Sequence, residues 1–119
     1  MTSKYFNEEI IDNLNLSNYL EWAETYAANL GLHGNGKEGL AISNALFRNL
    51  NFRIMNEFKS KFLSYENKII ERDLNDLKCD IENAIKYANS EKSKMSRLQN
   101  IREDFISIIT KTRNELCKL

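Results

Sequence analysis

The residues of this chain that could do chemistry gather in one glycine-rich segment, residues 31–37, which reads Gly-Leu-His-Gly-Asn-Gly-Lys. All four glycines of the chain lie in this segment or just after it, and His33 is the only histidine. Glycine amides that open a helix can hold an anion, and a nearby lysine strengthens such a site. One hypothesis for function is therefore a small-anion or nucleotide site at Gly34, Gly36 and Lys37.

Catalysis by this segment is not expected. The spacing matches G-x-x-x-x-G-K, but a P-loop requires Ser or Thr at the next position, where the hydroxyl binds magnesium. Glu38 stands there instead, and its negative charge would lie beside the phosphates. A single histidine cannot build a multi-histidine metal site, and the glycines after His33 disfavour the helix that a phosphotransfer histidine needs. We therefore expect no enzyme activity, no metal and no cofactor.

The elements that hold this segment are expected to be helices. Proline is absent, and glycine is absent after residue 39, so about eighty residues contain neither strong helix breaker. Apolar residues recur at helical spacing, and Asn18 with Glu21 and Asn35 with Glu38 have the spacing of capping boxes. We predict an all-α, single-domain antiparallel bundle with a short N-terminal helix, a glycine-rich loop at 31–37, and four main helices at about 17–30, 37–63, 66–88 and 92–118.

The second half of the chain allows two arrangements. The apolar heptad spacing of residues 70–88 continues in register through residues 95–119. One continuous helix would exceed ~70 Å and would need a partner chain to cover its apolar stripe. Polar residues at 89–93 favour a turn instead, which makes residues 66–118 a hairpin. A homodimer is compatible with either arrangement.

The chain has 17 basic and 17 acidic residues, but the two signs are not spread evenly. Segments 34–65 and 92–119 are basic, whereas the segments before and between them are acidic. Should the basic segments share a face, they would bind an anionic partner such as RNA or DNA. The residues that this nucleic-acid hypothesis assigns are Arg48, Arg53, Lys94, Arg97, Lys111 and Arg113.

The leading hypothesis is a non-enzymatic helical protein that acts by binding another protein, as an adaptor, an inhibitor or a small subunit. Trp22 and Tyr26 are of types common at interface centres, although both types also pack in cores. Arg102 interrupts the apolar heptad seam and is a third candidate interface residue. No apolar run approaches the ~20 residues of a membrane span. The start lacks a signal peptide's apolar core, and the two cysteines have no metal or redox spacing, so we expect a cytoplasmic protein that does not enter a membrane.

Overall fold

The computed structural model describes residues 5–32, 34–61 and 64–118, and these residues form helices and no strand. This confirms the predicted all-α helical bundle. His33 lies outside the described residues. The elements are α1 (Glu8–Asp12), α2 (Leu16–Ala28), α3 (Gly36–Arg53), the π-helix η1 (Ile54–Phe58), the 3₁₀-helix η2 (Lys59–Lys61), α4 (Ser64–Tyr87) and α5 (Glu91–Cys117).

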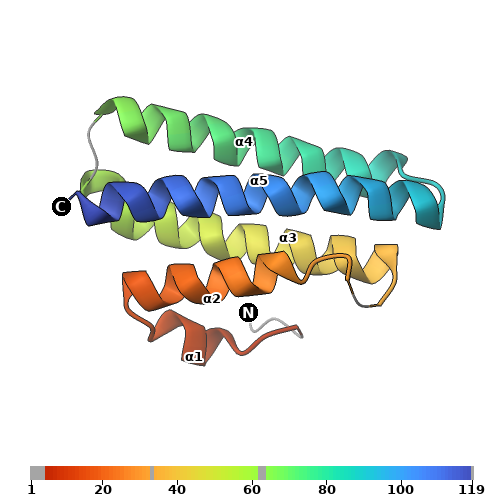
Figure 1. The fold of residues 1–119 in the computed structure, drawn as a ribbon, viewed down its shortest axis with the longest axis horizontal. Helices are drawn as coiled ribbons and strands as arrows, with labels where there is room; N and C mark the ends of the chain where they lie inside the picture. Colours follow the sequence, from red (N-terminus) through yellow and green to blue (C-terminus); the bar gives the residue numbers. More distant parts are fainter. Residues whose placement is uncertain (1–4, 33, 62–63, 119) are drawn as a thin grey trace.

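Four long helices run side by side along the 44 Å axis of the molecule (Figure 1). Helix α5 packs against α2, α3 and α4. Helix α3 also packs against α4 and, less extensively, against α2. In Figure 1, α4 lies at one side of the bundle and α2 near the other, with α5 between them. Helices α3 and α5 therefore form the centre of the bundle, because each packs against all the other long helices. No described helix has the length and apolar character needed to cross a membrane.

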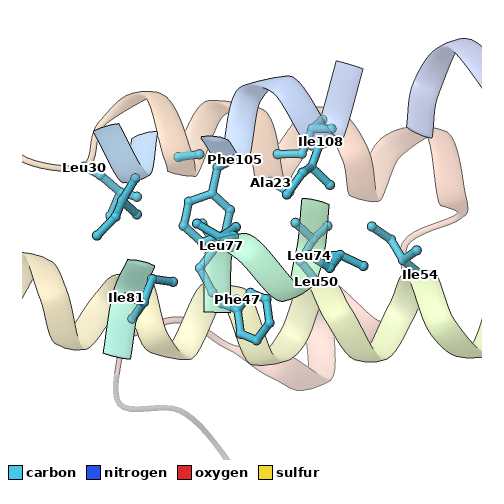
Figure 2. Packing of buried hydrophobic residues seen from close by; sticks show 14 of the residues in the cluster. Ala23, Leu30, Phe47, Leu50, Ile54, Leu74, Leu77, Ile81, Phe105 and Ile108 are labelled. Carbon is cyan, nitrogen blue, oxygen red and sulfur yellow. The ribbon is translucent and has the colours of Figure 1, made fainter. Parts of the chain in front are cut away.

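The core is one continuous cluster of side chains from all the long helices (Figure 2). Phe105 of α5 and Leu77 of α4 are fully buried in it, as is Leu50 of α3. Helix α2 contributes small residues such as Ala23, which lets its backbone approach α5. Burial of one such Leu or Phe side chain contributes about 1.5–3 kcal/mol to the free energy of unfolding. The bundle is therefore held by the apolar stripes that the helical spacing predicted.

Asparagine and serine side chains begin most of the helices. Asn35 Oδ1 accepts a hydrogen bond from the Glu38 amide at 2.7 Å, as the capping-box spacing predicted. Helix α2 begins at Leu16, close to the predicted start at about 17, and its N-cap is Asn15, whereas Asn18 lies inside the helix. Ser90 is the N-cap of α5 and follows a short turn after α4, so residues 66–118 form a hairpin and not one long helix.

The predicted helix 37–63 is wrong as one continuous α-helix. It ends at Arg53, widens into the π-helix Ile54–Phe58, and tightens into the 3₁₀-helix Lys59–Lys61. The π-helix keeps Ile54 and Phe58 buried. A π-helix differs from an α-helix only by a one-residue shift in hydrogen bonding, and apolar spacing does not separate the two.

Candidate functional site

The glycine-rich loop lies at the end of the bundle where α5 begins (Figure 1). Gly31 and Gly34 have φ of 79°, a conformation that favours glycine. The Gly36 amide, which the anion hypothesis needs, donates to Glu91 Oε1 at 2.7 Å. The Glu91 carboxylate of α5 therefore already occupies the N-terminus of α3. An external anion at Gly34, Gly36 and Lys37 would have to displace Glu91.

Two glycines of α3 permit the close approach of α5. A Cβ atom at Gly36 would lie 2.5 Å from Lys94 Cβ, and one at Gly39 would lie 2.5 Å from Leu98 Cδ1. These separations are far below ordinary van der Waals contact. Gly36 and Gly39 are three residues apart and face the same way, so they form a contact surface for α5.

The candidate interface residue Arg102 makes its contacts within the chain. Its Nε donates to the Leu30 carbonyl at 2.8 Å, and its Nη2 donates to the same oxygen. Leu30 follows the last turn of α2, where carbonyl groups lack helical partners. These hydrogen bonds of Arg102 therefore hold the C-terminal end of α2 against α5. They explain why a charged residue stands in the apolar heptad seam.

The other two candidate interface residues cover the N-terminal segment. Trp22 and Tyr26 are half-buried, and the ring of Phe6 meets both edge-on at centroid distances of 5.3 and 5.4 Å. The Tyr26 hydroxyl donates to the Tyr5 carbonyl at 2.9 Å. Within the described residues, this cluster binds the chain's own N-terminal segment to α2.

Arg53 is not part of an exposed basic surface, which corrects its assignment as a nucleic-acid contact. The residue is 3% exposed. Its guanidinium donates to the carbonyls of Ile11 and Leu14 at 3.2 and 3.0 Å, pairs with Glu57 at 2.9 Å, and lies over the ring of Tyr19. The contacts of Arg53 therefore hold α1 against the C-terminal end of α3.

The other basic candidates are distributed over different faces. Arg113 pairs with Glu24 of α2 at 2.8 Å, and Lys111 pairs with Asp73 of α4. Both therefore have anionic partners within the chain. Lys94 packs its stem on Gly36, and Arg97 lies in a hollow lined partly by Asp80 and Asn83. Arg48 alone among them lies on the groove between α3 and α4, so the described candidates do not build one basic face.

The surface that sequence analysis missed is a groove of about 580 Å³ between α3 and α4, which we call the α3–α4 groove. Its apolar lining is formed by Phe47, which is 7% exposed, and by half-buried Met55. Phe52 stands beside them with 64% of its surface exposed. A second hollow of about 190 Å³ shares Phe47 and Met55 and extends to Leu74 of α4. Phe52 lies outside the buried apolar stripe of Leu46, Leu50 and Ile54, and a large aromatic residue in that position was the signal in the sequence.

The polar side chains of the α3–α4 groove are suited to hydrogen bonding and ion pairing. Arg48 lies on the α3 side, and Lys78 and Glu82 lie on the α4 side. None of these three forms an ion pair with another described residue. Amides supply the remaining polar groups from α3 and η1, at Asn44, Asn51 and Asn56.

No protein-family model, curated protein or solved structure matches this chain.

An acidic pair lies on another face, where α4 meets α5. Desolvation, the hydrogen bond to Asp80 and the charge of Asp80 together raise the pKa of Asp104 to about 6, and the charges of Glu103 and Asp73 act in the same direction. Among the described residues, no group of three or more His, Cys, Asp or Glu side chains is arranged to hold a metal ion. Because the pKa of Asp104 is raised in the folded state, this pair makes the stability of the bundle depend on pH.

Proposed function

We propose that this protein is a non-catalytic binding protein, acting as an adaptor, an inhibitor or a small subunit, and that another protein chain docks in its α3–α4 groove. The observation that carries the proposal is the exposure of Phe52 beside the apolar lining formed by Phe47 and Met55. Single exposed apolar residues are ordinary on protein surfaces, and Ile10 and Tyr87 are further examples here. Phe52 differs because it stands at a groove, and aromatic residues at such places dominate binding energy.

The shape of the groove favours a helix as the docking element. On the α3 side the lining residues run from Asn44 to Asn56, which is about 18 Å or roughly three turns of helix. They form two ridges, each with a spacing of four residues, and Phe47 and Phe52 lie on different ridges. A helix that presents apolar residues at successive turns fits between such ridges.

Nucleic-acid binding is the alternative proposal. Single-stranded nucleic acid is bound by cations combined with stacking aromatics, and Arg48, Lys78 and Phe52 offer both. Glu82 in the same groove opposes it, because a carboxylate repels phosphates. Binding of a labelled single-stranded oligonucleotide that weakens steeply with salt, and that is lost in Arg48→Ala, would support this alternative over protein binding.

A photo-crosslinking amino acid placed at Phe52 tests protein binding directly. The matched control places the same amino acid at Tyr87, which is 56% exposed and outside the groove. We expect one defined crosslinked product at position 52, identified by mass spectrometry, which disappears when Met55→Glu places a charge in the apolar lining. Equal yields of the same products at positions 52 and 87 would contradict the proposal.

We further propose that the protein acts in the cytoplasm. Cys79 and Cys117 are exposed free thiols. Exposed thiols persist in reducing compartments, whereas oxidising compartments favour their conversion to disulfides. Localisation of a tagged chain by microscopy tests this directly.

A further inference from the structure

This inference rests on the proposed function, because it names the chain that occupies the α3–α4 groove. We propose that the occupant is a second copy of this protein, in a twofold-symmetric dimer that places groove against groove. Three properties of the groove favour a second copy as the occupant, namely its shape, its charges and its amides.

The groove carries both a projecting group and a recess. In an isologous interface one surface patch contacts the same patch on the other subunit, so the patch must be complementary to itself. Phe52 projects at 64% exposure, and the lining formed by Phe47 and Met55 lies beside it. When two copies meet, each Phe52 ring can enter the recess of the other copy. A partner that only filled the recess would leave Phe52 exposed, whereas a second copy covers both.

Two of the three charges of the groove, those of Arg48 and Glu82, are complementary in the same way, and the third belongs to Lys78 on the α4 side. Arg48 lies on the α3 side, and Glu82 lies on the α4 side of the same hollow. With the twofold axis parallel to the helices, α3 of one copy faces α4 of the other at the same height. Arg48 then meets Glu82 of the partner subunit, and the reciprocal pair forms as well. Neither residue has an ion-pair partner among the described residues of its own chain.

The remaining polar groups also suit a self-pairing surface. Asn44 and Asn51 each carry a donor and an acceptor, so an amide of one copy can satisfy an amide of the other. The chain has equal numbers of basic and acidic residues, so no net charge repels a second copy at long range. A strongly acidic or strongly basic partner would match only part of this lining.

Charge-swap variants test the inference sharply. Light scattering on a size-exclusion column should give about twice the 13.9 kDa chain mass for the wild type. We expect Arg48→Glu and Glu82→Arg each to weaken the dimer. In either variant, position 48 of one copy and position 82 of the other carry the same charge, and the twofold symmetry repeats this repulsion at a second place. An equimolar mixture of the two variants restores both opposite-charge pairs, so it should associate more tightly than either variant alone. Failure of the mixture to do so would overturn the inference.

A second variant tests the role of the aromatic ring. Phe52→Asp should weaken the dimer more than about tenfold, as loss of a central aromatic anchor does. Tyr87→Asp is the matched control, since Tyr87 is 56% exposed and lies outside the groove. Far-UV circular dichroism establishes that each variant remains helical. A dimer that is equally weakened by both changes, or by neither, would place the interface elsewhere and overturn the inference.

The outcome separates this inference from the proposed function. A wild-type chain that stays monomeric, together with a crosslink from position 52 to a different protein, overturns the dimer and leaves the proposed function standing. A crosslink from position 52 to a second copy supports both. A chain that stays monomeric and gives no specific product at position 52 overturns both.

Discussion

Replacing Asp104 by Asn should stabilise the protein at neutral pH and have little effect in acid. Burial and the neighbouring carboxylate of Asp80 raise the pKa of Asp104 to about 6 from its ordinary value of 3.8. The folded state therefore binds a proton that the unfolded state releases between these two values. Stability is lost as pH rises through this window, and the cost of the ionised pair is present in full above it.

The size of the effect follows from the shift. A difference of about two pKa units corresponds to ~3 kcal/mol if the carboxyl were fully shielded from solvent. The Asp104 side chain is only half-buried, so solvent screening reduces this figure to about 1 kcal/mol. Asp104→Asn removes the charge, keeps the shape, and leaves an amide that can donate to Asp80. We expect a gain of about 1 kcal/mol at pH ~7.5 that shrinks to a few tenths at pH ~4.

Urea unfolding at the two pH values measures this difference. The sole tryptophan, Trp22, is half-buried among aromatic rings and reports unfolding by its fluorescence. With a slope of ~2 kcal/mol per molar urea, the expected shift of the midpoint is about 0.5 M. Asp76→Asn on α4 is the control, because Asp76 is exposed and is not among the groups that act on Asp104. The reasoning is refuted if Asp104→Asn destabilises at neutral pH, or if its effect is the same at both pH values.

Changes at three further positions test the contacts that hold the helices together, and each is measured by urea unfolding. Gly39→Ala should destabilise the folded protein by about 1–2 kcal/mol, because the new Cβ would overlap Leu98. This cost exceeds the ~1 kcal/mol that alanine gains over glycine in helix propensity. An increase in stability would show that α5 can move away. Arg53→Met should destabilise by about 3 kcal/mol, since buried carbonyls and a carboxylate lose their donor; a change below ~1 kcal/mol would contradict that role. Glu91→Ala should cost about 1 kcal/mol by removing the acceptor of the Gly36 amide, whereas Glu91→Gln, which keeps an oxygen, should cost less.

The helices and most of their ends could be predicted from the sequence because they depend on neighbouring residues. Apolar spacing marked the stripes that form the core, and Asn35 was recognisable as a cap by its distance from Glu38. The turn before Ser90 followed from local polar composition. The π-helix could not be predicted in this way, because Ile54–Phe58 has an ordinary helical composition.

The contacts of the arginines could not be predicted, because their partners are distant in the sequence. Arg53 binds carbonyls near residue 11, and Arg102 binds the Leu30 carbonyl. A charge count treats such residues as free surface cations, whereas the fold surrounds them with acceptors. The sequence did contain a sign of the candidate groove, since Phe52 is a large aromatic residue outside the apolar stripe of its helix. Only the position of α4 shows that it borders a groove.

The packing of α2 against α5 has a consequence for how the chain is made. Helix α2 leaves the ribosome well before its main partner α5, because α3 and α4 lie between them in the sequence. At about 5–20 residues per second, the contacts Arg102–Leu30 and Arg113–Glu24 stay unformed for several seconds after α2 emerges. The α4–α5 hairpin needs only a short turn, so we expect it to form quickly once both helices are available. The nascent chain therefore reaches its native bundle only after α5 has emerged and covers the apolar face of α2.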